Sequence, residues 1–231
     1  GLLLAGIKIR RTRWMNISEI LSHVDHTQLK AYASWEDIIN LCEEAIRLKT
    51  ASVCVPPCYV GKIREAFEDK VRICTVVGFP LGYSVTEAKV AEVKQALKDG
   101  ADEIDVVVNI CDVKNHDFQA VREELARIRE AAGIHVLKVI IETCYLSEEE
   151  KIQLCKIITQ VGADYIKTST GFGPEGAKLS DIELFKENIG PQVKIKAAGG
   201  IRTAQSMEEF LNAGCQRIGS SSAADLCKED R

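Results

Sequence analysis

The chain of 231 residues lacks the features that mark several functional classes. Its 30 basic and 34 acidic residues are interleaved and give a formal net charge of −4, so no basic stripe is present for binding nucleic acid. The apolar stretch at its start is too short to span a membrane. No low-complexity linker divides the chain. We therefore expect one domain, with neither a nucleic acid nor a membrane as partner.

The nine cysteines form neither a clear metal site nor a disulfide framework. Their number is odd, and most lie in apolar runs, where a free cysteine behaves as a small buried hydrophobe. Cys54 and Cys58 have loose metal-type spacing, but no second pair and no histidine couple lies near them. A closed zinc site needs about four ligands. We expect no bound metal, reduced thiols and a cytoplasmic location.

The first fourteen residues differ from a secretory signal, because their apolar part precedes the basic cluster instead of following it. We expect Met15 to be the natural start of the chain. Residues 1–14 would then be an N-terminal extension or a cloning remnant, and residues 15–231 would form the domain.

After Met15, short apolar runs alternate with segments of helical period. Several runs are rich in β-branched residues and almost continuously apolar, which is typical of parallel strands covered on both faces. The runs are "ILSHVDH", "TASVCVPP", "VRICTVVGF", "DEIDVVVNI", "HVLKVIIET", "DYIKTST", "VKIKAAGG" and "QRIGSS". Ser84, Ser147 and Ser180 each precede a glutamate by three residues, a spacing that predicts helix starts. Gly100 and Gly162 predict helix ends before a strand.

Alternating strands and helices form either an open doubly wound sheet or a closed barrel. The glycine-rich dinucleotide fingerprint of the open sheet does not follow the first strand, where the sequence reads "VDHTQLKAY". Glycine-rich loops follow the last three strands instead, and barrels commonly bind phosphate there. The sequence predicts a single-domain α/β fold, a (β/α)8 TIM barrel.

Charged and polar residues gather where the predicted strands end, which is where barrel enzymes carry their functional groups. These residues are Asp25, His26, Thr27, Cys54, Asp105, Lys138, Glu142, Lys167, Lys194 and Lys196. A single strand lysine is usually one that extends its ammonium group to water. Here three consecutive strands each contribute at least one lysine, which favours a functional cluster over separate lysines that reach solvent. Neighbouring cations and partial burial lower a lysine's pKa, and the neutral amine that results is what Schiff-base formation with a carbonyl requires.

Three loops carry glycines and hydroxyls after the last three strands: "STGFG", "GGIR" and "GSSS". Glycine allows the backbone N–H groups to approach an anion closely, and a helix N-terminus adds a favourable dipole. The residues that we expect to hold a phosphate are Thr170, Gly171, Gly199, Gly200, Gly219, Ser221 and Ser222.

These motifs, together with "VDHTQLK" and "SVCVPP", closely resemble the 2-deoxyribose-5-phosphate aldolase family, from about Ile20 to Leu226. The resemblance implies a class I aldolase without metal or cofactor, which reversibly cleaves 2-deoxy-D-ribose 5-phosphate to D-glyceraldehyde 3-phosphate and acetaldehyde in deoxyribonucleoside catabolism. It implies Lys167 as the Schiff-base nucleophile and Asp105 as the proton donor and acceptor. Lys196 would be the second proton-handling group and the cation that depresses the pKa of Lys167.

The remaining residues have weaker assignments. Asp25, Thr27, Cys54 and Lys138 are expected to support the site, and Lys194 is expected to be peripheral. Some relatives carry a lysine where this chain has Phe172. We therefore expect the phosphate-binding site of this chain to have one cation fewer. The expected partners are small phosphosugar and aldehyde substrates and further copies of the chain, as a dimer or tetramer. Two alternatives stay open: another phosphosugar barrel aldolase or isomerase, and a non-catalytic sugar-phosphate-binding barrel.

Overall fold

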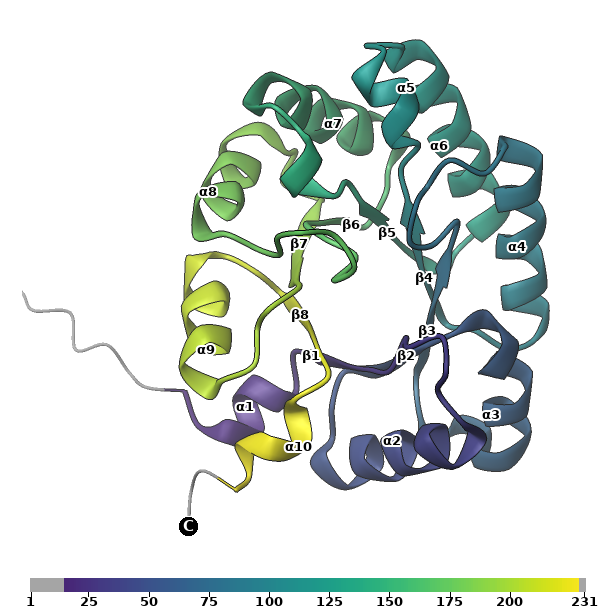
Figure 1. Cartoon of the computed structure of the whole chain (residues 1–231), viewed down its shortest axis with the longest axis vertical. Coiled ribbons are helices and arrows are strands. Elements are labelled where there is room, and N and C mark those ends of the chain that lie inside the picture. Colours follow the sequence, from purple (N-terminus) through teal and green to yellow (C-terminus); the bar gives the residue numbers. More distant parts are fainter. Residues whose placement is uncertain (1–14, 229–231) are drawn as a thin grey trace, which may run out of the picture.

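The computed structural model describes residues 15–228, so the expected extension, residues 1–14, lies outside the described part. Eight parallel strands close into a barrel in sequence order, with β8 paired to β1 (Figure 1). The strands are β1 (Val24–Thr27), β2 (Ser52–Val55), β3 (Ile73–Val77), β4 (Glu103–Val107), β5 (Val136–Ile140), β6 (Tyr165–Lys167), β7 (Lys194–Ala198) and β8 (Arg217–Ser220). The predicted (β/α)8 barrel is confirmed.

Helices surround the barrel, as the view along its axis shows (Figure 1). The described helices are α1 (Ile17–Leu21), α2 (Trp35–Leu48), α3 (Val60–Phe67), α4 (Thr86–Lys98), α5 (Ile110–Lys114), α6 (Phe118–Ala132), α7 (Glu148–Val161), α8 (Leu179–Asn188), α9 (Ala204–Ala213) and α10 (Ala223–Leu226). Short 3-10 turns are η1 (Pro57–Tyr59), η2 (Glu68–Lys70) and η3 (Thr143–Tyr145). Within this part of the chain, no helix is both long and apolar enough to cross a bilayer.

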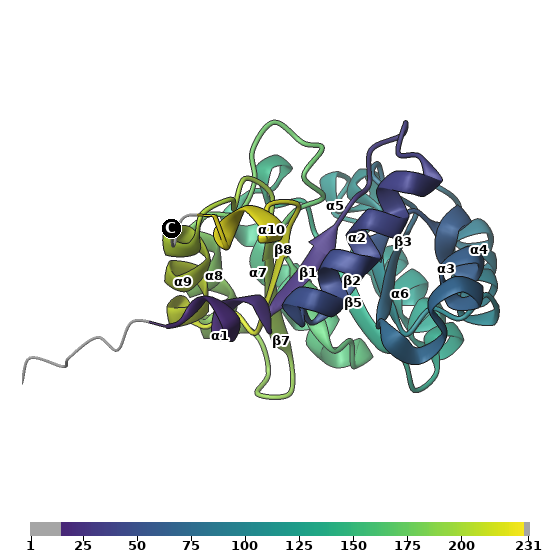
Figure 2. The same ribbon diagram turned by 90° about the horizontal axis from the view of Figure 1, so that it is seen from below.

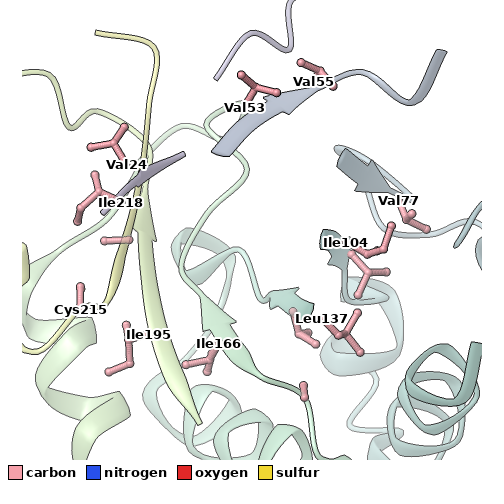
Figure 3. Packing of buried hydrophobic residues seen from close by; sticks show 14 of the residues in the cluster. Val24, Val53, Val55, Val77, Ile104, Leu137, Ile166, Ile195, Cys215 and Ile218 are labelled. Atoms are coloured by element: carbon pink, nitrogen blue, oxygen red, sulfur yellow. The ribbon is translucent and has the colours of Figure 1, made fainter. Parts of the chain in front are cut away.

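On most strands an apolar outer face alternates with an inner face of charged or polar residues, whereas β3 carries Cys74 and Val76 on its inner face. Figure 3 shows outward residues such as Ile104, Leu137 and Ile166 in the layer between strands and helices. Each is fully buried, and such burial contributes about 1.5–3 kcal/mol per side chain. Because neighbours on a strand face opposite ways, Asp105 and Lys167 point into the barrel. The hydrophobic effect on the outer face therefore fixes the charged residues inside.

The helix boundaries show which local signals decide. Ser147 caps α7 and forms a reciprocal capping box with Glu150, as predicted. The boxes predicted at Ser84 and Ser180 are wrong: α4 begins after Val85, and α8 begins one residue before Ser180. Gly162 ends α7 in the left-handed conformation, which glycine adopts without a steric penalty.

The first predicted strand is also corrected at its start. Ile20 and Leu21 belong to α1, and β1 begins only at Val24. Both residues are buried and face the core, so their apolarity reflects helix packing. The final helix, α10, is short, as expected from the sequence after the last strand.

Candidate active site

A cavity of about 360 Å³ opens at the carboxyl ends of β6, β7, β8 and β1. Figure 2 shows the loops after β6 and after β1 rising at the same end of the barrel. Residues from all three predicted phosphate loops line the cavity, namely Thr170, Gly171, Gly199, Gly200, Gly219 and Ser221. Its basic lining residues are Lys30, Lys167 and Arg202, and no acidic residue of the described chain lines it. The cavity therefore favours an anionic ligand.

The glycines of these loops provide close backbone approach. A Cβ built on Gly176 would lie 2.1 Å from the carbonyl oxygen of Gly199, so the loop after β6 packs directly on the loop after β7. The N–H of Ala177 donates to Ala198 O at 3.1 Å and holds the two loops together. On β8, a Cβ on Gly219 would lie 3.2 Å from Cε of Lys196. Glycine there leaves room for the lysine.

Asp105 joins the two lysines nearest the cavity. Its Oδ2 accepts hydrogen bonds from Lys167 Nζ and from Lys196 Nζ, each at 2.9 Å. Lys167 and Lys196 are directly opposed on β6 and β7, and their inward orientation brings both ammonium groups to one carboxylate. Lys167 is 3% exposed and is the member of the trio that lines the cavity.

A second set of charges lies deeper in the barrel. Lys138 Nζ contacts Asp105 at 3.0 Å, Asp25 at 3.2 Å and Glu103 at 2.6 Å. Arg217 bridges Asp25 at 2.6 Å and Glu103 at 2.8 Å. Asp25 also accepts from Lys196, at 2.5 Å. Opposite charges thus alternate across the barrel, which is the condition under which buried ions are tolerated.

The ion pairs decide the protonation states. Burial alone would raise the pKa of Asp105, but Lys138, Lys167 and Lys196 outweigh it and hold that pKa well below its usual range. The pKa of Asp25 is lowered in the same way: burial raises it, but Lys138 and Lys196 outweigh the effect of burial. Both carboxyl groups are therefore ionised at neutral pH.

Lys138 and Lys196 behave differently from the expectation that clustered lysines depress one another's pKa. Burial lowers the pKa of Lys196, but Asp105 and Asp25 outweigh it and raise the pKa above its ordinary value. The pKa of Lys138 is likewise raised, by Asp105 and Asp25 against burial. The expectation is wrong for these two residues, because three buried carboxylates lie between the lysines. Lys196 is thereby kept as a cation beside Lys167.

Sequence comparison assigns the chain to a family. Residues 20–224 match the model described as DeoC/LacD family aldolase. The chain belongs to this family. It is 60% identical over 214 residues to a deoxyribose-phosphate aldolase of Clostridium botulinum (strain Alaska E43 / Type E3), covering 93% of this chain and 97% of that one. A deoxyribose-phosphate aldolase of Clostridioides difficile (strain 630) is 53% identical, covering 93% and 98%.

Solved structures of aldolases have the same fold. A tetrameric deoxyribose phosphate aldolase from Aeropyrum pernix superposes with a TM-score of 0.86 at 31% identity, covering 93% of this chain and 92% of that one. A protein described as QR15, an aldolase, gives a TM-score of 0.87 at 38% identity, covering 92% and 96%.

Other predicted site residues of this family member lie at different depths. Thr27 lines the cavity, and its hydroxyl donates to Asp25 O at 2.7 Å. Cys54 is fully buried within the barrel and does not line the cavity. Ser222 lies beside the cavity lining, where its N–H donates to the Ser220 hydroxyl. Lys194 is exposed at the start of β7, away from the mouth, as its peripheral assignment predicted.

Sequence reasoning missed several members of the site. Glu103 and Arg217 each lie two residues before a predicted inward residue, so the period of two on a strand was a usable signal. Glu142 was not missed, since the sequence already placed it at the end of the fifth strand; it accepts hydrogen bonds from both the N–H and the hydroxyl of Thr170, and so fixes the loop after β6. Lys30 ends the motif "VDHTQLK", but no role was assigned to it from the sequence.

Two sets of buried donors have spacings that a metal would accept: Cys54 with Cys74 and Asp105, and Asp25 with Cys74 and Glu103. In both sets the carboxylates already pair with buried ammonium or guanidinium groups. A metal cation would have to compete with these cations for the same oxygens. The arrangement suits acid–base chemistry by side chains better than metal binding.

Proposed function

We propose that the chain reversibly cleaves 2-deoxy-D-ribose 5-phosphate to D-glyceraldehyde 3-phosphate and acetaldehyde, through a Schiff base on Lys167. The observation that carries this proposal is the position of Lys167 Nζ, which borders a basic cavity and lies 2.9 Å from a carboxylate shared with Lys196. Family membership and the names of the relatives at 60% and 53% identity support the substrate.

The first step is attack of the Lys167 amine on the C1 aldehyde of the open-chain sugar. Loss of water from the adduct gives a protonated imine, which withdraws electrons from the bond to be broken. Lys196 remains positively charged beside Lys167. Asp105 contacts both nitrogens and is placed to pass protons to and from the adduct.

Cleavage of the C2–C3 bond follows and releases D-glyceraldehyde 3-phosphate. The C3 hydroxyl loses its proton, the bonding electrons move into the imine, and an enamine of acetaldehyde remains on Lys167. Protonation of that enamine and addition of water release acetaldehyde. We assign these protons to Asp105, Lys196 and a water molecule, because Asp105 Oδ2 lies 2.9 Å from Nζ of both Lys167 and Lys196.

The phosphate of the substrate binds between the glycine loops. Backbone atoms of the glycine loops line the cavity, and the serines of the last loop add hydroxyl groups. The glycines are Gly171, Gly199, Gly200 and Gly219. Lys30 and Arg202 contribute positive charge where Phe172 contributes none. Binding energy from the phosphate orients the reacting carbons over Lys167.

Borohydride trapping tests this proposal. The protein is incubated with acetaldehyde, reduced with borohydride and digested, and the peptides are analysed by mass spectrometry. An ethyl adduct is expected on Lys167 and on no peptide of the Lys167→Ala variant. An adduct on Lys138 or Lys196 would contradict the assigned nucleophile. Lys194→Ala is the matched control. It removes an exposed lysine from the start of β7, the end away from the cavity, and should leave the adduct unchanged.

The same experiment separates the alternatives. Tight binding of deoxyribose 5-phosphate without any reduced adduct would favour a non-catalytic sugar-phosphate-binding barrel. An adduct with a different phosphosugar, and none with acetaldehyde, would favour another barrel aldolase. Activity that is lost with EDTA and restored by a divalent metal would contradict the Schiff-base mechanism.

We further propose that the enzyme works as a homo-oligomer in the cytoplasm, within deoxyribonucleoside catabolism. The tetrameric relative from Aeropyrum pernix supports an oligomer. All nine cysteines are free, which suits a reducing compartment. Light scattering coupled to size-exclusion chromatography measures the oligomeric state directly, and a monomer at micromolar concentration would contradict this part of the proposal.

A further inference from the structure

Two cysteines lie side by side inside the barrel, next to the catalytic carboxylate. Cys54 on β2 and Cys74 on β3 are directly opposed in the strand register, and both are fully buried. Their sulfur atoms and a carboxylate oxygen of Asp105 lie within 4.8 Å of one another. With Val76 they form a small apolar cluster separate from the main core. The proposed reaction assigns no role to this thiol pair.

Cys74 contacts two of the charged groups directly. Its thiol donates to Asp105 Oδ1 at 3.2 Å, and Lys138 Nζ donates to its sulfur at 3.3 Å. Any change in the bonding of this sulfur therefore changes the hydrogen bonds of Asp105. Asp105 in turn holds Lys167 through its other oxygen.

The cavity approaches the thiol pair at one side chain. Leu29 packs against the cysteine cluster and also lines the cavity, so one half-buried side chain lies at the boundary between the two. Rotation of a single leucine side chain is fast on the timescale of thiol oxidation. A molecule the size of a hydroperoxide thus has a short route from the cavity to the thiols.

The two thiols differ in their readiness to ionise. The hydrogen bond with Cys74 lowers the pKa of Cys54 against burial, and the cations Lys196 and Lys167 lower it further. Burial raises the pKa of Cys74, and its neighbours Cys54 and Asp105 raise it too. Because the thiolate is the nucleophile, Cys54 is the thiol that reacts first.

We propose that Cys54 and Cys74 form a peroxide-sensitive disulfide site that reversibly inhibits the enzyme. The Cys54 thiolate attacks a hydroperoxide, the O–O bond breaks, and a sulfenic acid forms on Cys54 as hydroxide or alkoxide leaves and takes up a proton. The Cys74 sulfur then attacks the Cys54 sulfur, the S–O bond breaks, and hydroxide leaves with the Cys74 proton as water. With hydrogen peroxide, two thiols and one oxidant give one disulfide and two waters.

The fold is compatible with this bond, and the bond disturbs the site. Neighbouring strands lie about 4.7–4.9 Å apart, which is within the Cα separation that disulfides span. The disulfide removes the thiol proton that Asp105 accepts and draws the Cys74 sulfur toward Cys54. Asp105 then loses the hydrogen bond to its Oδ1, while its Oδ2 is the oxygen that accepts from Lys167. We expect activity to fall about tenfold or more, because small displacements of reacting groups are costly.

The test treats the full chain with hydrogen peroxide and measures two quantities. Non-reducing peptide mass spectrometry should find the Cys54 and Cys74 peptides joined, lighter by two hydrogen atoms than the separate peptides. Aldolase activity should fall in parallel with this cross-link and return with dithiothreitol. Only the activity readout rests on the proposed function, because the cross-link is detected whatever the reaction.

Two variants separate this site from the other thiols. Cys58→Ser/Cys111→Ser removes both exposed cysteines and should keep the basal activity, the cross-link and the reversible inhibition. Cys74→Ser keeps a hydroxyl donor for Asp105 but cannot form the disulfide, so dimedone should label a persistent sulfenic acid on Cys54. The proposal is overturned if inhibited wild-type protein carries no cross-link, or if the cross-link forms without loss of activity. It is also overturned if reversible inhibition disappears with the exposed cysteines.

Discussion

The two ends of the barrel use their charged residues in opposite ways. At the N-terminal end, Asp102 and Asp164 make equivalent contacts. Each accepts one hydrogen bond at 2.8 Å from a backbone N–H near the start of the preceding strand, Ile73 or Leu137, and another from an arginine. At the mouth, Lys30 and Arg202 line the cavity, and neither forms an ion pair with any residue between 15 and 228. Charge at one end joins the elements together, whereas charge at the other is left available to a ligand.

Inside the barrel, the charged residues at the strand starts differ in the same way from those next to the cavity. Arg217 and Glu103 begin their strands and pair with each other and with neighbouring charges. Lys167, two residues into β6 and next to the cavity, has Asp105 as its partner. Arg217 should therefore affect mainly stability, and the lysines near the mouth should affect mainly catalysis. The variants below test that division, in order of decreasing expected effect.

Arg217→Met should give the largest loss of stability. The variant leaves Glu103 and Asp25 with one cation fewer, and breaking a buried pair typically costs about 3–5 kcal/mol. Urea unfolding followed by circular dichroism measures the change in the free energy of unfolding. Arg127→Met is the matched control, because its pair with Glu87 is exposed and such pairs contribute about 0–1 kcal/mol. Equal losses in the two variants would contradict the division.

Lys196→Gln should give the largest loss of catalysis. Removing a group that moves protons typically lowers rate by about 100-fold or more, so kcat for deoxyribose 5-phosphate cleavage should fall by at least that factor. Lys194→Gln lies on the same strand, exposed at its start, and should retain full activity. If the two variants lost similar activity, the placement of Lys196 beside Lys167 would have no catalytic meaning.

The sequence contained enough to predict the barrel and the main site. Strand alternation and the rule that barrel sites lie at strand ends place Asp105, Lys167 and Lys196 together, and the three glycine loops follow from chain order. These features depend on local sequence and on the closure of the barrel. They do not require knowledge of individual side-chain contacts.

The protonation states could not be predicted in the same way. The lysines are visible in the sequence as neighbours, but Asp25 and Glu103 reach them across the barrel, and Arg217 is 192 and 114 positions away from these two partners. Which charges touch depends on strand tilt and side-chain reach. The same limit applies to Cys54 and Cys74, whose pairing follows from strand register.

Asp164→Ala should destabilise the N-terminal end without affecting catalysis. It leaves the buried N–H of Leu137 without its acceptor, which costs about 1–3 kcal/mol, while the exposed part of the pair with Arg129 adds little. Asp164→Asn keeps an acceptor and should lose less. Gln216 supports this expectation, because its neutral Oε1 fills the same role for the N–H of Ile195 at 2.9 Å. Unfolding experiments and kcat/KM together check both parts, and a drop in kcat/KM for folded Asp164→Ala would contradict them.

Lys30→Ala should give the smallest effect, and one confined to phosphorylated substrate. Losing one cation at the phosphate should lower kcat/KM for deoxyribose 5-phosphate about tenfold, and should leave kcat/KM for deoxyribose unchanged. Lys62→Ala is the matched control, since Lys62 also lies over an aromatic ring, that of Trp35, but outside the cavity. Adding Phe172→Lys to Lys30→Ala restores a cation on the facing loop and should recover most of the loss. Equal losses with both sugars would mean that Lys30 shapes the mouth of the cavity and does not bind phosphate.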